Sequence, residues 1–199
     1  NKYEGVVMLN IWPGYAVQTV SKNGKRDVVK GPQIIHLEYD QTLEVLELST
    51  GKPKTDNTLY RTAYLQTQNN IVSDIIEAVT SDQVQVSIRL SYRVNFTEGK
   101  EEKWFSVSNY VKLLTQHLRS VVRNAIKKTT LENFNEKSTD IIRDTVLGNV
   151  VEGKRPGKSF DENGMVVYDV EVLNVQINDS AVSRLLMDTN HKIVENNLK

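Results

Sequence analysis

The sequence predicts an α+β protein, in which a β-rich first part precedes an antiparallel sheet that helices cover on one face. Three observations indicate this class. Apolar residues occupy every second position from Val84 to Phe96, which is the pattern of a long strand with one buried face. From Asn109 the apolar spacing changes to three and four residues, as in an amphipathic helix. An Asn-Gly pair at 23–24 between two strand-like runs predicts a hairpin.

The first unit is expected to span residues 1–80. Residues 15–20 and 27–30 should be the two strands of the hairpin, and Gly31-Pro32 should end the second of them. Short apolar runs then predict further strands at 34–37, 43–48 and 59–66. A polar loop at residues 49–57 is expected between the last two of these strands. The boundary to the second unit, residues 81–199, is expected near Thr80-Ser81-Asp82.

The second unit begins with the long strand and the amphipathic helix. Thr129 and Glu132 have capping-box spacing, so a short helical turn should start at Thr129. Another helix should run from about Thr139 and stop at Gly148. The predicted structural core of this unit comprises Val86, Ile88, Leu90, Tyr92, Leu114, Leu118, Val121, Ile142 and Val170.

A last strand is expected from Met165 to Ile177. Its apolar positions include Val166, Tyr168, Val170 and Val172, and then change phase at Leu173. Such a change of the buried side predicts a β-bulge near Val172-Leu173. A final helix should begin at Asn178 or Asp179 and continue to Lys199.

The composition limits the function. The 199 residues hold 25 Lys plus Arg and 25 Asp plus Glu, so no direct DNA binding is predicted. There is no cysteine, which excludes disulfides and thiolate chemistry in this chain and fits a cytoplasmic protein. No apolar run is long enough to cross a bilayer. Because the chain starts without methionine and ends within an apparent helix, we expect it to be part of a longer protein.

The sequence predicts no catalytic, metal-binding or cofactor-binding residue. Its three histidines, His36, His117 and His191, are far apart and form no metal-ligand motif. The loop at Gly51-Lys52 lacks the upstream glycine and the following helix of a phosphate-binding loop. A binding or assembly role is therefore favoured, and a hydrolase that uses His36 or His117 stays as a further hypothesis.

Several segments resemble a known family. They are the strand 84–96, the helix end at Arg119 to Ile126, the turn at Thr130 to Phe134, Ile141-Ile142-Arg143, and the strand entry at Glu162 to Val167. Together they resemble the SPFH (band 7) module of stomatins, prohibitins and flotillins, and most of all the shoulder domain of the major vault protein family. The first unit is similar to the vault repeat that precedes that shoulder, through Val29 to Pro32, Leu37 to Asp40 and Leu43 to Leu48.

The resemblance implies a four-stranded antiparallel sheet backed by helices, and a non-enzymatic structural subunit of a large homo-oligomeric, vault-like cytoplasmic ribonucleoprotein shell. It also implies RNA or protein cargo in the assembled particle. The polar face of the long strand and the last helix are the expected contacts between copies, through Arg89, Arg93, Arg184 and Lys192. The alternative is a membrane-associated scaffold of the stomatin or prohibitin type, and only this alternative implies membrane contact.

Overall fold

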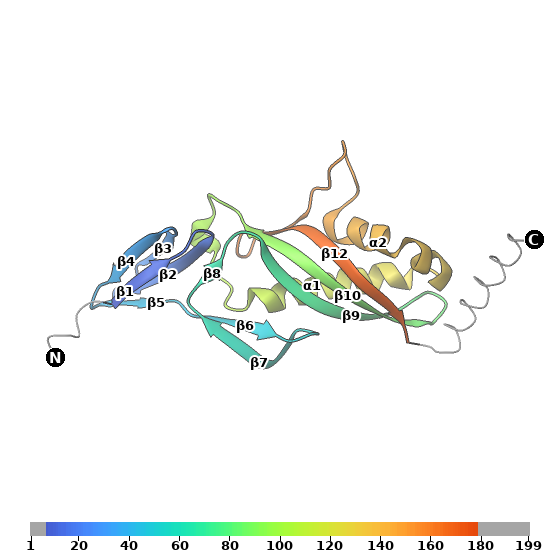
Figure 1. The fold of residues 1–199 in the computed structure, drawn as a ribbon, viewed down its shortest axis with the longest axis horizontal. Helices are drawn as coiled ribbons and strands as arrows, with labels where there is room; N and C mark the ends of the chain where they lie inside the picture. The colour runs from blue at the N-terminus through green and yellow to red at the C-terminus, as the bar shows by residue number, and fades with distance from the viewer. Residues whose placement is uncertain (1–6, 179–199) are drawn as a thin grey trace, which may run out of the picture.

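The computed structural model describes residues 7–178 and confirms the α+β class. Small antiparallel sheets form the first part of the chain, and a larger antiparallel sheet with two helices on one face forms the second (Figure 1). No helix within the described residues is long and apolar enough to cross a membrane.

Short strands make up the first part: β1 (Val7–Ile11), β2 (Tyr15–Ser21), β3 (Arg26–Lys30), β4 (Gln33–Leu37), β5 (Gln41–Leu43), β6 (Leu46–Thr50), β7 (Thr55–Thr62) and β8 (Leu65–Gln66). Strand β2 lies between β3 and β5 and also pairs with β8, while β1 pairs with β4. The predicted Asn23-Gly24 hairpin is confirmed as the β2–β3 connection, where Gly24 has a φ of +87°. Strands β6 and β7 form a separate hairpin.

The larger sheet has the strand order β11-β12-β10-β9, and every pairing in it is antiparallel. Its strands are β9 (Asn70–Val79), β10 (Gln85–Phe96), β11 (Lys158–Phe160) and β12 (Met165–Ile177). Strand β10 lies in the centre of the sheet, so its alternating face becomes the middle of the core.

The predicted boundary near residues 80–82 falls in the tight turn between β9 and β10. These two strands pair over ten positions, from Gln85 opposite Val79 to Val94 opposite Asn70. A domain border would cut this hairpin, because β9 packs in the same sheet as β10. We therefore propose that the second unit begins before Asn70.

Helix α1 (Tyr110–Lys127) begins as predicted after Asn109, whose side chain accepts a hydrogen bond of 3.0 Å from the Lys112 amide. The predicted cap at Thr129 is wrong. The Thr129 hydroxyl donates backwards to the Ala125 carbonyl at 3.2 Å and so closes α1. Thr130 caps the next helix instead, because its hydroxyl accepts from the Asn133 amide.

The two helices expected after Thr129 are one bent helix, α2 (Leu131–Leu147). Lys137 has a non-helical φ of −122°, which places a kink between the predicted short turn and the predicted start at Thr139. The predicted end at Gly148 is confirmed, since Gly148 has a φ of +87°. A 3₁₀ turn, η1 (Glu101–Lys103), was not predicted.

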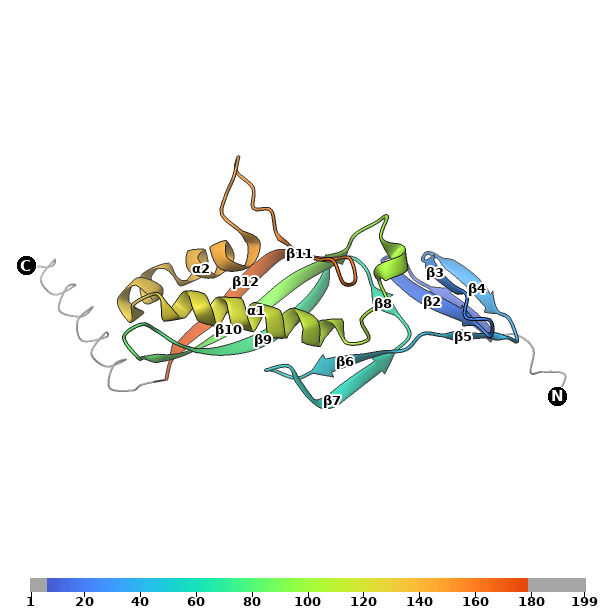
Figure 2. The same ribbon diagram turned by 180° about the vertical axis from the view of Figure 1, so that it is seen from behind.

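Both helices lie over the same face of the sheet, as Figure 2 shows. Eight of the nine predicted core residues are fully or almost fully buried: Val86, Ile88, Leu90, Tyr92, Leu114, Leu118, Ile142 and Val170. Val121, the ninth, is half-buried and packs against the edge of this cluster. The core therefore forms between the inner face of β10 and the apolar faces of α1 and α2.

Strand β12 contains the predicted bulge and a second one. Val172 lies opposite Leu90 and Asn174 lies opposite Arg89, so Leu173 is the extra residue. A further shift leaves Tyr168 without a partner. The expected face through Val166 and Tyr168 is therefore wrong, because Met165 and Val167 are the buried residues there and Tyr168 is exposed. The expected final helix lies outside the described residues.

Candidate functional site

The outer face of the large sheet carries the predicted contact residues Arg89 and Arg93. Arg89 is exposed. Arg93 is engaged within its own sheet, since its Nη2 donates to Glu171 Oε1 at 2.9 Å and its Nε donates to the same oxygen at 3.3 Å. This hydrogen bond raises the pKa of the Arg93 guanidinium above its ordinary value. Arg184 and Lys192, the other two predicted contact residues, lie outside the described residues.

The two long strands on either side of β10 have backbone carbonyls that accept from arginine side chains. Arg123 Nε on α1 donates to the Glu77 carbonyl of β9 at 2.8 Å, and Arg143 Nη1 on α2 donates to the Val170 carbonyl of β12 at 2.7 Å. Arginine contacts of this kind occupy strand groups that could otherwise pair with a strand of another chain. They disfavour joining of copies by sheet extension.

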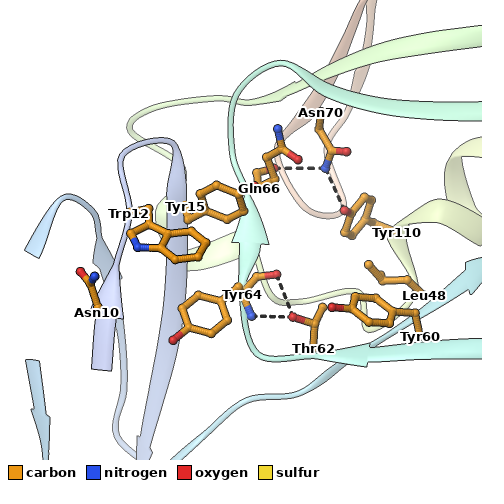
Figure 3. Close-up of a pocket in the computed structure, with 10 residues that line it drawn as sticks. All are labelled: Asn10, Trp12, Tyr15, Leu48, Tyr60, Thr62, Tyr64, Gln66, Asn70 and Tyr110. Carbon is orange, nitrogen blue, oxygen red and sulfur yellow. Dashed lines mark hydrogen bonds between the residues drawn. The ribbon is translucent and has the colours of Figure 1, made fainter. Parts of the chain in front are cut away.

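A pocket of about 450 Å³ lies between the β1–β2 region, the β6–β7 hairpin and the start of α1 (Figure 3). Five of its ten lining residues are aromatic, and none of the ten is charged. The lining residues are Asn10, Trp12, Tyr15, Leu48, Tyr60, Thr62, Tyr64, Gln66, Asn70 and Tyr110. We call this site the aromatic pocket.

Each wall of the aromatic pocket belongs to a different element. Trp12 follows β1 and packs edge-to-face on Tyr15 at the start of β2, with ring centroids 6.1 Å apart. Tyr60 lies on β7 and Tyr64 follows that strand. The Tyr64 amide donates to Thr62 Oγ1 at 3.1 Å, which fixes the bend between β7 and β8.

The back of the pocket is held by a buried pair. Asn70 Nδ2 donates to the Tyr110 hydroxyl at 2.8 Å and to the Gln66 carbonyl at 3.2 Å. Burial raises the pKa of the Tyr110 hydroxyl, although its hydrogen bond with Asn70 acts in the opposite direction. Tyr110 therefore stays neutral and joins β9 to the first turn of α1.

The β6 wall is fastened to the start of α1. Asn109 Oδ1 accepts from the Ser49 amide at 3.1 Å, and Asn109 Nδ2 donates to Ser49 Oγ at 2.9 Å. The Glu47 amide also donates to the Ser108 carbonyl at 3.2 Å. The same asparagine thus caps the helix and holds the hairpin, so the pocket wall is positioned by the core.

Three of the aromatic lining residues of the pocket are partly exposed to solvent. Trp12 is 61% exposed, Tyr60 is 60% exposed and Tyr64 is 36% exposed. Neutral amides, those of Asn10 and Gln66, add hydrogen-bonding groups. This surface suits apolar side chains, and its rings can also hold a cation over their faces. Its ten lining residues include no carboxylate, histidine or lysine.

Sequence reasoning did not find this pocket. Its aromatic residues are spread from Trp12 to Tyr110, and each one taken alone fits an ordinary strand or helix end. The only local signal is the pair Tyr60 and Tyr64, whose even spacing places two rings on the same side of an extended segment.

The histidines that the structure describes are not brought together. His36 is exposed on β4, and His117 on α1 packs edge-to-face against Phe160 with centroids 5.5 Å apart. Within residues 7–178 there is no group of three potential metal ligands. His191 lies outside this range.

Comparison with known proteins identifies the family. A family model described as "Shoulder domain" (MVP_shoulder) matches residues 68–179, a range that includes β9. Major vault protein beta of Dictyostelium discoideum is 32% identical over 151 residues, which is 75% of this chain and 18% of that protein. Major vault protein of Trypanosoma cruzi is 32% identical over 180 residues, covering 88% of this chain and 21% of that protein.

Human major vault protein is 31% identical over 189 residues, covering 86% of this chain and 21% of the human protein. The chain thus spans about a fifth of the length of the curated relatives that it matches. Because the family model matches more than half of the chain, and its range contains the whole sheet and both described helices, the chain belongs to the major vault protein family, within which it contains the shoulder domain.

Proposed function

We propose that this chain is part of a non-enzymatic, structural subunit of a large homo-oligomeric, vault-like shell. The observation that carries the proposal is the shoulder-domain match over residues 68–179. The vault proteins of a slime mould, a trypanosome and a mammal are all similar to this chain, which supports the same role across that range.

The fold supports a structural role. The sheet is covered by helices on one face and leaves Arg89 exposed on the other. The described residues place uncharged aromatic groups, rather than paired acids and bases, around the pocket of about 450 Å³. Such a surface is suited to contact with another protein chain.

We also propose where the subunit acts and to which superfamily its second unit belongs. The subunit would act in the cytoplasm, in an assembled particle with RNA or protein cargo. The order of strands and helices is the basis for placing the second unit in the SPFH superfamily. The vault relatives favour a shell over a membrane-bound scaffold of the stomatin type.

Electron microscopy and light scattering of the full-length protein test the proposal. The expected result is closed hollow particles of many copies at micromolar concentration. A protein that stays monomeric at high concentration under the same conditions would overturn it. Flotation with lipid vesicles is the matched comparison, since a membrane scaffold rises with the vesicles and a free shell does not.

A further inference from the structure

The connection between α2 and β11, residues 148–157, projects away from the body of the molecule (Figure 1). We call it the knob. It presents two adjacent apolar side chains to solvent, because Val150 is 56% exposed and Val151 is 67% exposed. Two exposed valines side by side on a projection form an apolar surface that lies outside the hydrophobic core.

The knob is an ordered structure. At its tip the Val151 amide donates to the Lys154 carbonyl at 2.7 Å, and the Lys154 amide donates to the Val151 carbonyl at 3.0 Å. Glu152 and Gly153 between them both have positive φ, 52° and 78°, as in a type I′ turn. The tip is therefore a closed two-residue hairpin.

The base of the knob is tied to the end of α2. The Gly157 amide donates to the Leu147 carbonyl at 2.7 Å. Arg155 Nη1 donates to the Gly148 carbonyl at 2.8 Å and forms an ion pair with Asp144. A projection fixed at both its tip and its base loses little conformational entropy when it binds, and this favours it as a contact element.

The knob lies on the other side of the molecule from the β6–β7 hairpin, which carries part of the pocket wall. Figures 1 and 2 both show the knob rising on one side of the long axis, while the β6–β7 hairpin lies on the opposite side. That hairpin carries Leu48, Tyr60 and Thr62 of the pocket wall. Copies placed side by side across the long axis would point the knob of one toward the hairpin of the next.

Resting on the proposed function, we propose that the knob of one copy enters the aromatic pocket of the adjacent copy. The valines supply apolar surface for the rings of Trp12, Tyr60 and Tyr64. The ammonium group of Lys154 supplies a cation for a ring face in a pocket that holds no charge of its own. Knob and pocket are different surfaces of one chain, so the contact is head-to-tail and can close a ring.

The absence of cysteine from these 199 residues gives a direct test. One sample of full-length protein carries Val151→Cys, a second carries Tyr60→Cys, and cysteines elsewhere in the full chain are replaced. The two samples are co-assembled and mildly oxidised. The expected result is a covalent dimer in the mixed particles, formed by neither sample alone. A chain that carries both substitutions should give a ladder of covalent oligomers.

Tyr39→Cys is the matched control for the pocket variant. Tyr39 is 82% exposed but lies outside the pocket, so its mixture with Val151→Cys should stay monomeric on the gel. Intact mixed particles that lack the covalent dimer would overturn the knob proposal without contradicting the proposed shell function. Protection of the Tyr60→Cys thiol from maleimide without that dimer would mean another occupant and would also overturn it. Absence of particles in the unsubstituted protein would instead defeat the proposed function.

Paired serine substitutions give a second readout. Val150→Ser with Val151→Ser removes apolar surface from an exposed turn, so the melting temperature of the dissociated subunit should be unchanged. The fraction of protein in particles should fall, and Tyr39→Ala should leave it unchanged. Unaltered assembly by the serine variant would contradict the proposal.

Discussion

Arg119 on α1 and Asp74 on β9 form a bidentate ion pair inside the second unit. Nε donates to Oδ2 and Nη2 donates to Oδ1, both at 2.7 Å, and the Asp74 side chain is fully buried. The same pair holds Lys54, whose amide donates to Asp74 Oδ1 at 2.9 Å and whose carbonyl accepts from Arg119 at 2.8 Å. The pair thus fastens the β6–β7 hairpin, and with it one wall of the aromatic pocket, to the large sheet.

Substitution of Arg119 by Met should destabilise the protein strongly. The variant keeps most of the side-chain length but leaves the buried Asp74 carboxylate without its partner, at a cost of about 3 to 5 kcal/mol. Urea unfolding measures the loss. Arg123→Met is the control on the same helix, because Arg123 is exposed and donates only to a backbone carbonyl. Similar losses of unfolding free energy for the two variants would show that the buried Asp74 carboxylate does not need its ion pair with Arg119.

Substitution of Leu90 by Ala tests the core of the sheet. Leu90 is fully buried on β10, so the variant should lose about 2 to 5 kcal/mol of unfolding free energy. Leu173→Ala is the matched control, since Leu173 lies in the neighbouring strand but is 53% exposed at the bulge. A loss below about 1 kcal/mol for Leu90→Ala would contradict the assigned face of β10.

The buried face of β10 and the first bulge of β12 could be predicted from the sequence, because local patterns determine both. The alternation around Leu90 determines the buried face of β10, and the phase change at Leu173 marks a bulge, because both signals lie within one strand. The Tyr168 bulge was missed, since the even spacing of Val166, Tyr168 and Val170 continues across it in the sequence. Only the pairing with β10 reveals that one residue is extra.

The start of α2 and the aromatic pocket needed three-dimensional information. Thr129 and Thr130 are equally good caps by residue type, and the choice depends on which backbone group each hydroxyl reaches. The pocket brings Trp12 next to Tyr64 and Tyr60 near Tyr110 through pairings between distant strands. No short-range pattern encodes such neighbours.

The Glu101 carboxylate should titrate far below ordinary glutamates. Lys30 Nζ donates to Glu101 Oε1 at 2.9 Å, and the Gly99 amide donates to the same oxygen at 3.1 Å. Lys30, the amide of Glu101 itself and the Gly99 amide together lower the pKa of Glu101 from 4.5 to about 2. Because the folded-state pKa is the lower one, the contribution to stability is complete above pH 4.5. It is lost as the pH falls from 4.5 toward 2.

Carboxyl NMR titration of the wild type and of Lys30→Met measures this effect. The substitution should move the Glu101 pKa back toward 4.5, whereas Lys25→Met should not, because Lys25 pairs with Asp27 instead. An unchanged Glu101 pKa in Lys30→Met would mean that the backbone amides alone hold the carboxylate. It would also remove the electrostatic link between β3 and η1.

Substitution of Gly148 by Ala should disturb the end of α2 and the base of the knob together. Gly148 has a φ of +87°, and a Cβ there would lie 2.7 Å from Pro156 Cγ. Gly99→Ala is the matched control, because Gly99 has a φ of +92° but its added Cβ would meet no atom within 4 Å. Both variants incur backbone strain of about 1 to 3 kcal/mol, and only Gly148→Ala adds the clash. Urea unfolding should therefore show a larger loss of unfolding free energy for Gly148→Ala than for Gly99→Ala. Equal losses would mean that Pro156 moves away from the added Cβ without a measurable loss of stability.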